Sequence, residues 1–518
     1  MNMKKRRLYA ILLMLLTMTL TATAQRRGVG CWRGKAARQT DTRARLLSRA
    51  SAEDGNTFIG TKHGLVILAE FSDKKFKAAN DREKYNNILN TIGYDEGKFI
   101  GSVTDYFRDQ SSGLFNMVFD VVGPYTLKHG YKYYGENDSD GNDLRPQEMV
   151  TEMCMAADAE VNFADYDWDG DGFVDEVFVV YAGKGEANGG SVNTIWPHMW
   201  SIREATGTYV LLDGVQIDIY ACSNELDSSG NINGIGTFCH EFSHCLGLPD
   251  FYDVYYKGSF GMSDFDLMSG GSYNGSGFCP AGYTAYEKMV CGWQDPIVLS
   301  DKDVEVEHLL PLSEYGDSYI IYNEGHPDEF YMIENRQKTK WDASLPSAGL
   351  MITHVDYDEE IWANNIPNSI LTLREAIDEG LTCGNDHQRM TIFHADNDDD
   401  SRYWRAAAGY YTKTTLGTDL YPYLLRDSLT ATSTPAATLY NVNLEGTKLM
   451  RGAILDITQN DDLTMGFRYR APLPVHDAIR DISNDSDNSE QYYNLSGHKV
   501  KQSVRGIYIV GGKKVVVR

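Results

Sequence analysis

Hydrophobic and polar residues follow two patterns in the first part of the chain. Residues 64–71 and 177–181 are short apolar runs rich in branched side chains, which predicts buried strands. Residues 102–107 and 148–157, which lie between these runs, have the pattern of helices. We therefore expect an α/β fold for this part of the protein.

The later part of the chain alternates between apolar and polar residues instead. Residues 215–220 alternate in this way, and we expect them to form an edge strand over a cleft. Similar segments between residues 304 and 470 predict a β-rich extension, with strands at 318–322, 329–334 and 349–355.

The C-terminal segment has a different composition. Residues 476–491 are rich in Asp, Asn and Ser, as linkers are. Gly511 and Gly512 then separate two apolar runs, residues 507–510 and 515–517, which predicts a hairpin within a small β-module.

The N-terminus has the pattern of a secretory signal peptide. Four basic residues precede an apolar run at 8–20, and Ala22-Thr23-Ala24 predicts cleavage before Gln25. This run is too short for a membrane span, and no other stretch is long enough, so we expect no stable membrane insertion.

The chain has 518 residues, which are enough for more than one domain. Its charge is distributed unevenly along the sequence. The net charge of −25 argues against a nucleic-acid partner and suits a secreted or calcium-binding protein. Residues 26–49 are nevertheless basic, which is consistent with a removable pro-segment that covers an acidic cleft. A leader with no inhibitory role is the alternative.

The chain has eight cysteines, of which Cys31 lies in the basic leader. Loss of the leader would leave seven, an odd number that cannot pair completely. A thiolate is a good zinc ligand, so Cys31 is also a candidate for holding an enzyme latent, although its surroundings match no known latency motif.

The main chemical signal is H-E-x-x-H-x-x-G-x-x-D, which starts at His240. His240 and His244 are four residues apart, so on a helix both imidazoles point to one spot. Two neutral imidazoles and one carboxylate match the tetrahedral preference of zinc and leave one position open. Glu241 is rotated about 100° from His240 and suits a general base that takes a proton from water.

The third zinc ligand depends on how the chain turns after the helix. Gly247 can adopt the left-handed conformation of a helix C-terminus, and Pro249 cannot continue the helix. This turn returns Asp250 toward the histidines, with Asp253 as the substitute if the turn is wider. A buried helix with satisfied core histidines is the competing interpretation. We expect Cys239 and Cys245 to be small core residues.

A second candidate cation site lies in D-Y-D-W-D-G-D-G-F-V-D, residues 165–175. The spacing of five residues in it is that of a calcium loop: Asp167, Asp169, Asp171, Gly172 and Asp175. Position 12 is Phe178 and not the glutamate of an EF-hand, which indicates a structural calcium site. A surface turn rich in Asp and Gly is the alternative.

The motifs together resemble a known family. Met268 lies in D-F-D-L-M-S-G-G-S-Y-N and resembles the Met-turn of metzincins, in which the thioether lies beneath the metal. With L-P-D-F-Y-D after Gly247, I-W-P-H-M-W at 195–200 and Y-M-I-E-N-R-Q at 331–337, the chain resembles the immune-inhibitor-A family of secreted bacterial metallopeptidases. The resemblance extends over about residues 64–356 and implies a metzincin-like peptidase fold. His198 and Tyr273 are candidates for stabilising the oxyanion.

Residues 492–518 resemble the C-terminal sorting signal of the type IX secretion system. This resemblance implies export across the outer membrane and the secretion machinery as a partner. Without it, the segment indicates only a small β-module.

These expectations define five segments: a signal peptide at 1–24, a pro-segment at 25–56, a zinc metallopeptidase domain at 57–298, a β-rich extension at 299–474, and a linker with sorting module at 475–518. We expect a secreted zinc endopeptidase that acts on extracellular proteins or peptides, with calcium as a second cation. The alternatives are a secreted adhesin or glycan-binding protein with an idle zinc site, and a zinc hydrolase of non-protein substrates.

Overall fold

The computed structural model describes residues 57–139, 141–399 and 416–473 with their side chains. It also describes the backbone of residues 492–493, 499–500, 506–510 and 513–517. The expected signal peptide, the pro-segment with Cys31 and the linker at 476–491 lie outside the described residues.

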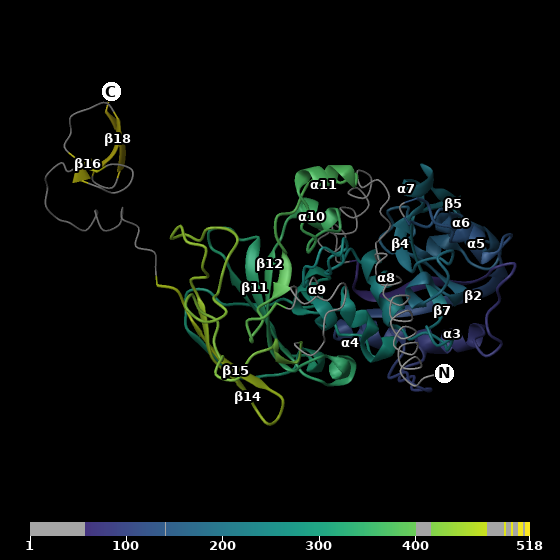
Figure 1. Ribbon diagram of the computed structural model, residues 1–518, viewed down its shortest axis with the longest axis horizontal. Helices are drawn as coiled ribbons and strands as arrows, with labels where there is room; N and C mark the ends of the chain where they lie inside the picture. The colour runs from purple at the N-terminus through teal and green to yellow at the C-terminus, as the bar shows by residue number, and fades with distance from the viewer. Residues whose placement is uncertain are drawn as a thin grey trace, which may run out of the picture.

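A five-stranded sheet in the order β2-β1-β3-β7-β4 forms the centre of the N-terminal part (Figure 1). Its strands are β1 (Gly60–Glu70), β2 (Phe115–Thr126), β3 (Val177–Lys184), β4 (His198–Ser201) and β7 (Ile219–Leu226). The first four strands in this order are parallel, and β4 is antiparallel to β7 at the edge. The strands predicted at residues 64–71 and 177–181 are thus confirmed, apart from the last residue of the first.

Helices cover both faces of this sheet, which explains the nearly continuous apolar runs of its inner strands. Val66 and Phe178 pack on the face covered by α3 (Arg82–Asn90), α4 (Val103–Gln110) and α8 (Gly236–Cys245). Their sequence neighbours Leu65 and Val177 point to the other face, which α6 (Pro146–Ala157) covers. The two predicted helices correspond to α4 and α6, and a capping box between Ser102 and Asp105 begins α4.

The prediction of an edge strand at residues 215–220 is wrong. Residues Val215–Ile217 form β6, which pairs with β5 (Val210–Leu212) in a small hairpin, and β7 starts at Ile219 inside the main sheet. Asp218 separates the two strands, because its carboxylate accepts hydrogen bonds from the Ser201 hydroxyl and the Arg203 amide. The strand at the edge of the main sheet next to β7 is β4 instead.

The extension contains two antiparallel-rich sheets. One has the order β13-β12-β11-β10-β8 and the other β14-β15-β9. The bounds are β8 (Ile297–Val298), β9 (Val304–Leu309), β10 (Tyr319–Tyr322), β11 (Glu329–Arg336), β12 (Gly349–Asp356), β13 (Met390–Ile392), β14 (Ala453–Gln459) and β15 (Met465–Arg470). The strands predicted at 318–322, 329–334 and 349–355 are confirmed by β10, β11 and β12.

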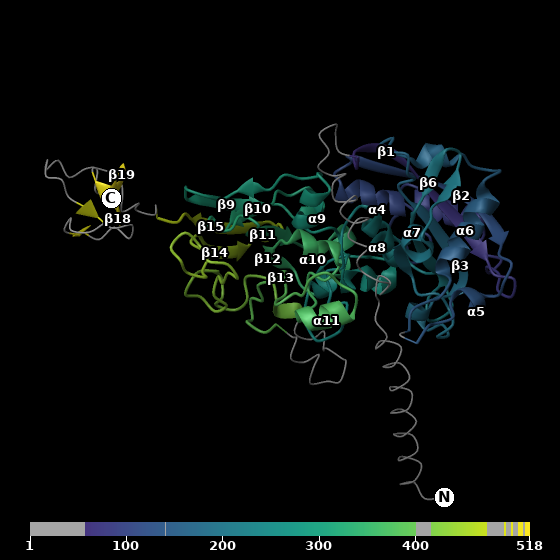
Figure 2. The ribbon, with the colours of Figure 1, turned by 90° about the horizontal axis from the view of Figure 1, so that it is seen from above.

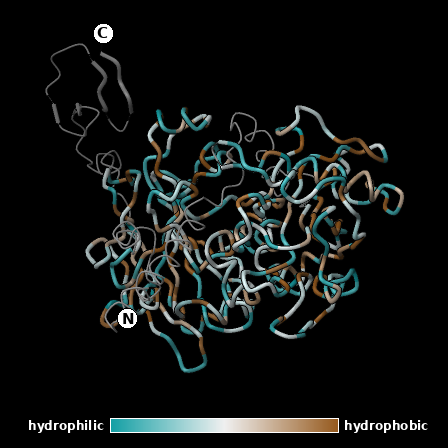
Figure 3. The backbone as a smooth tube through the Cα atoms, turned by 45° about the vertical axis from the view of Figure 1, so that its right-hand side comes forward, coloured by the Kyte–Doolittle hydropathy of each residue, from teal (hydrophilic) through white to brown (hydrophobic). Residues whose placement is uncertain are grey.

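The hydrophobic core is continuous between the N-terminal part and the extension. Met332 and Met351, on β11 and β12, belong to the same buried cluster as Phe251 and Tyr286. The opposite face of β11 packs toward the second sheet, which makes a sandwich. Figure 2 shows the two parts side by side along the long axis, and Figure 3 shows hydrophilic residues predominating in the peripheral loops.

Shorter elements connect these layers. They are α5 (Tyr131–Tyr134), η2 (Phe163–Tyr166), η3 (Glu186–Asn188), α7 (Ile202–Thr206), η4 (Ser263–Phe265), η5 (Gly270–Gly277), α9 (Ala285–Val290), η6 (Leu312–Glu314), η7 (Lys340–Ser344), α10 (Glu359–Ala363), α11 (Leu373–Asp378) and η8 (Leu416–Thr418). Among the residues that the structure describes, no helix has both the length and the apolar character that a membrane span needs.

Four short C-terminal strands pair in the order β17-β16-β18-β19. They are β16 (Tyr492–Tyr493), β17 (Lys499–Val500), β18 (Gly506–Val510) and β19 (Lys513–Val517). β18 and β19 are antiparallel neighbours, and Gly511-Gly512 between them lies outside the described residues.

Candidate metal centre

The two motif histidines lie one turn apart on α8, which is buried along nearly its whole length. The ring centroids of His240 and His244 are 4.8 Å apart. The helix ends after Cys245, and Gly247 adopts a left-handed φ of 93° while its amide donates to the His244 carbonyl. A residue with a Cβ would be strained at this φ, so glycine makes the sharp turn that follows possible.

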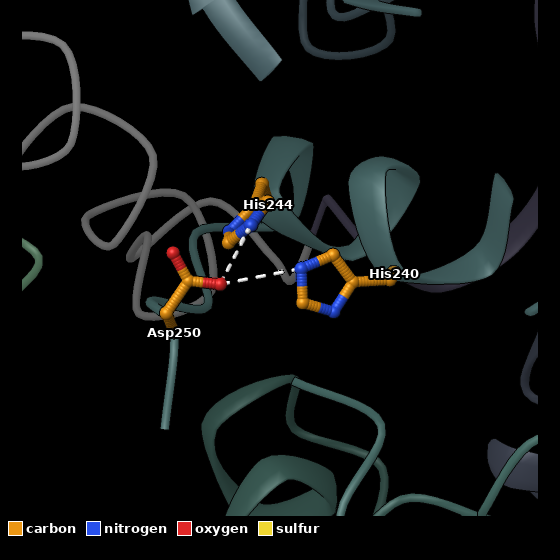
Figure 4. Close-up of side chains that lie close together, drawn as sticks. All are labelled: His240, His244 and Asp250. Atoms are coloured by element: carbon orange, nitrogen blue, oxygen red, sulfur yellow. Dashed lines mark ion pairs between the residues drawn. The ribbon is translucent and has the colours of Figure 1, made fainter. Parts of the chain in front are cut away.

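This turn brings Asp250 to the histidines (Figure 4). Asp250 Oδ1 is 3.2 Å from His240 Nε2 and 3.3 Å from His244 Nε2. One candidate ligand atom from each residue lies within 4.8 Å of the others, and all three residues are buried. The structure therefore gathers two imidazole nitrogens and one carboxylate oxygen at one point.

Backbone carbonyl groups fix the orientation of both imidazole rings. His240 Nδ1 is 2.8 Å from the Leu267 carbonyl oxygen, and His244 Nδ1 is 2.8 Å from that of Leu248. A carbonyl oxygen can only accept, so each Nδ1 carries the proton that it donates. In the neutral rings, the Nε2 lone pairs then face Asp250, as ligation by Nε2 requires.

The carboxylate of Asp250 is satisfied on one side and open on the other. Its Oδ2 accepts from Asn365 Nδ2 at 2.6 Å, whereas its buried Oδ1 has no hydrogen-bond partner among the described residues. Burial raises the pKa of Asp250, but His244 and His240 more than offset this and hold it well below its usual value. An ionised oxygen facing two imidazole nitrogens fits a divalent cation with a preference for nitrogen and oxygen ligands, such as Zn²⁺.

Asp253, the substitute ligand, is not part of this group. Its Oδ2 accepts from the amides of Gly258 and Ser259, and its Oδ1 accepts from the Ser369 hydroxyl. The tight turn at Gly247 brings Asp250 to the imidazoles, so Asp253 lies further along and organises the following loop instead.

Glu241 is also buried, with 3% of its surface exposed, and it lies outside the ligand group. Burial raises its pKa to about 8, while His240 and the backbone N–H of Met199 on β4 oppose the rise. A carboxylate with this pKa can both take and return a proton near neutral pH.

The two oxyanion candidates differ in position. His198 lies on the α6 side of the sheet with Cys222, where its Nδ1 is 2.6 Å from the Trp196 carbonyl and its Nε2 is 2.9 Å from the Tyr220 hydroxyl. Burial lowers its pKa to about 4, so it is a neutral core residue and not an oxyanion donor.

Tyr273 on η5 lies near the candidate centre and is 47% exposed. Desolvation, together with the carboxylates of Glu241 and Asp250, raises its pKa above the usual value. Its hydroxyl therefore keeps its proton and can donate a hydrogen bond.

Met268 lies in a turn that is hydrogen-bonded to the loop carrying Asp250. It is fully buried, its amide donates to Asp266 Oδ1 at 2.6 Å, and its carbonyl accepts from the Phe251 amide at 2.8 Å. The preceding carbonyl, that of Leu267, is the one that orients His240. Leu267 and Met268 thus contact the ligand helix and the ligand loop through their carbonyl groups.

The second candidate site brings together three of its four proposed aspartates. Carboxylate oxygens of Asp167, Asp169 and Asp175 lie within 4.8 Å of one another. Asp171 is not in this group, and its Oδ1 accepts from the Phe173 amide at 2.8 Å.

Cysteine residues do not contribute to either group. Cys239 and Cys245 are buried in the core around α8, and none of the seven described cysteines forms a disulfide.

Asn365 contacts Asp250, and none of the sequence motifs predicts this contact. It lies in N-N-I-P-N-S, which has the composition of a surface loop, and it is 115 residues from Asp250.

Comparison with known proteins agrees with this geometry. Residues 60–293 match the family described as immune inhibitor A peptidase M6, catalytic domain. The chain is 28% identical over 216 residues to the pre-pro-metalloprotease PrtV of Vibrio cholerae serotype O1, which covers 36% of this chain and 23% of that protein. It is 26% identical over 268 residues to immune inhibitor A of Bacillus thuringiensis subsp. alesti. This alignment covers 43% of this chain and 38% of that protein.

The chain therefore spans less than two fifths of the length of these relatives. The matched region contains both candidate cation sites and Met268. The similarity is thus to the catalytic domain of a metallopeptidase family and to proteins named as metalloproteases.

Proposed function

We propose that this protein is a secreted zinc-dependent endopeptidase that hydrolyses extracellular proteins or peptides. The observation that carries the proposal is the buried group of His240, His244 and Asp250, with an Asp250 oxygen that has no other described partner. Glu241 lies beside this group on the same helix. The family match over residues 60–293 supports the same assignment.

His240, His244 and Asp250 would hold the zinc ion. When bound, it would supply a Lewis acid for the scissile carbonyl and lower the pKa of a water molecule. Glu241 takes the proton from the attacking water and later passes it to the leaving amine, a role that fits a buried carboxylate beside the ligand group. The Tyr273 hydroxyl donates a hydrogen bond to the developing oxyanion.

The metzincin-like reading of the fold is part of the proposal. It is supported by the turn at Met268, which is buried and bonded to the loop that carries Asp250. Asp167, Asp169 and Asp175 are proposed to bind calcium as a structural cation, because three converging carboxylates repel one another without one.

Secretion is proposed from segments at the ends of the chain. Residues 1–24 would be a signal peptide, 25–56 a removable pro-segment, and 475–518 a linker with a sorting module read by the secretion machinery. The name of the relative from Vibrio cholerae, a pre-pro-metalloprotease, supports the removable N-terminal segments.

The decisive test is the variant Glu241→Gln, which keeps the size of the side chain and removes the base. We expect it to retain zinc and to lose about 10²- to 10⁴-fold in casein hydrolysis, because only proton transfer is affected. Zinc content by metal analysis and hydrolysis with and without a chelator are the measurements.

His244→Ala is the matched control and should lose the metal together with the activity. Near-parental proteolysis by Glu241→Gln would exclude Glu241 as the base. Tight zinc binding without hydrolysis of any protein would favour a non-protein substrate or an idle metal site.

A further inference from the structure

A segment of the extension holds the loop that carries the third candidate ligand. This segment, residues 364–369, follows α10, which Figures 1 and 2 show between β12 and α8. Asn368 Nδ2 donates to the Phe251 carbonyl at 2.8 Å, and the Ser369 hydroxyl donates to Asp253 at 2.9 Å. The extension therefore contacts the ligand loop at two residues that follow Asp250 closely.

Asn365 makes the contact with Asp250 itself, and it does so with both ends of its amide. Its Nδ2 donates to Asp250 Oδ2 at 2.6 Å, and its Oδ1 accepts from the Asp250 backbone amide at 2.7 Å. The two bonds fix both the backbone and the carboxylate of one residue. With Oδ2 held in this way, Oδ1 faces the two imidazoles.

Asn365 is itself held firmly. Its backbone has a left-handed φ of 58°, and its amide donates to the Trp362 carbonyl at 3.0 Å. Asn is one of the few residues with a side chain that accept this conformation. Asn385 Nδ2 also donates to the carbonyls of Ile366 and Ser369, which fixes the segment from the other side.

The indole of Trp362 packs near Phe251, with ring centroids 6.4 Å apart, and near Tyr286 at 6.3 Å. These rings belong to the core that both parts of the protein share. The position of Asn365 is thus set by the shared core, in which Trp362 of the extension packs against Phe251 of the ligand loop.

We propose that Asn365 is a positioning residue for the metal centre, which fixes the rotation of the Asp250 carboxylate so that Oδ1 is aimed at the cation before the cation binds. This inference rests on the proposed zinc peptidase function. A carboxylate rotates about its last bond in a broad, two-fold potential, so a partner is needed to hold one orientation. Partners of this kind, one step removed from a metal, contribute to its affinity.

The test is zinc affinity, measured by competition with a chelator, alongside the melting temperature of the metal-free protein. Asn365→Gly removes the amide and adds no strain, because glycine accepts the φ of 58°. We expect its zinc dissociation constant to rise about 10- to 100-fold. Asn365→Asp keeps the shape and replaces the donor with an acceptor, and it should weaken zinc binding as well.

Ser369→Ala is the matched control, because it removes a contact from the same segment to the same loop but not to Asp250. It should lower the melting temperature of the metal-free protein and leave the zinc dissociation constant close to the parental one. Equal zinc affinities for Asn365→Gly, Asn365→Asp and the parent protein would show that Asn365 is only structural. Should Asn365→Gly not fold, Asn365→Asp decides by the same measurement.

The outcome also separates this inference from the proposed function. Parental protein that binds zinc, loses activity in Glu241→Gln and is indifferent to Asn365 would retain the function and overturn the positioning role. Parental protein that binds no zinc would overturn both.

Discussion

The buried carboxylate of Glu329 is held by several hydrogen-bond donors. Glu329 on β11 accepts from His354 Nε2 at 2.9 Å, from Asn323 Nδ2 at 3.0 Å and from the Asn441 amide at 3.0 Å. Burial alone would raise the pKa of Glu329, but these donors and the Tyr440 amide lower it to about 2. The ionised form is thus part of the folded extension.

The pH dependence of stability follows from this. Because the pKa of Glu329 is about 2 in the folded protein and near 4.5 ordinarily, its contribution is present above about pH 4.5 and is lost as the pH falls toward 2. We expect Glu329→Gln to abolish on the order of 2 kcal/mol of the acid-dependent change in unfolding free energy. This change in unfolding free energy can be measured by denaturant unfolding at several pH values between about 6 and 2.5, which is roughly the range in which carboxylates titrate.

Glu307→Gln, at an exposed position of β9, is the control with the same change of charge. It should keep the acid dependence of the parent protein. If Glu329→Gln and the parent lost stability in parallel as the pH fell, Glu329 would not be the group responsible.

At the residue scale, the local part of the site could be predicted and the distant part could not. Helix geometry alone places His240 and His244 together, and Gly247 permits the turn to Asp250. Asn365 is different, because its contact with Asp250 depends on the fold of the extension. His198 was a poor candidate for a similar reason. Its face of the sheet is decided by the pairing of β4 with β7, which the local sequence does not reveal.

At the element scale, strands and helices with strong patterns were predicted well. β1, β3, α4 and α6 each bury a continuous apolar run or one apolar face. The segment at 215–220 was not predicted well, because alternation over six residues is equally typical of a hairpin strand and of the edge strand of a large sheet. The choice is made by Asp218, whose bonds to Ser201 and Arg203 interrupt the strand.

The loop at residues 167–175 provides a testable prediction at this scale. If calcium binds there, it should stabilise the folded state by about 2.7 kcal/mol when its concentration is 100 times the dissociation constant. We expect Asp169→Asn to remove most of this gain, because Asp169 is one of the three converging carboxylates. Thermal unfolding with calcium and with a calcium chelator is the measurement.

Asp165→Asn makes the same change of charge nearby, at a residue outside the group. This control should respond to calcium as the parent does. A parental melting temperature that is indifferent to calcium would argue against the site.

At the scale of the whole molecule, the extension packs closely on the N-terminal part. Arg336 of β11 is fully buried and forms ion pairs with Glu334 and Asp342, and its guanidinium donates to the Gly282 carbonyl at 3.1 Å. Asp342 in turn accepts from the Gly282 amide at 2.9 Å. Together with the shared core around Phe251, these contacts tie the segment around Gly282 to the extension.

Truncation at two positions tests this view. A chain that ends at residue 298 loses Asn365 and Arg336 and exposes the shared core, so we expect it to be insoluble or inactive. A chain that ends at Leu473 keeps every contact described for the metal centre. We expect it to bind zinc and digest casein as the full chain does when both are produced in a foreign host and freed of their N-terminal segments.

The longer truncation also tests the proposed role of the tail. In the native host it should retain export by the signal peptide and accumulate before the outer membrane, because the proposed sorting module at 475–518 is absent. Measuring casein hydrolysis in the periplasmic and extracellular fractions distinguishes the outcomes. Normal extracellular activity would exclude a sorting function for the tail. Loss of activity in the purified truncated protein would instead make the tail part of the enzyme, since the contacts of Asn365 and Glu241 are all retained before Leu473.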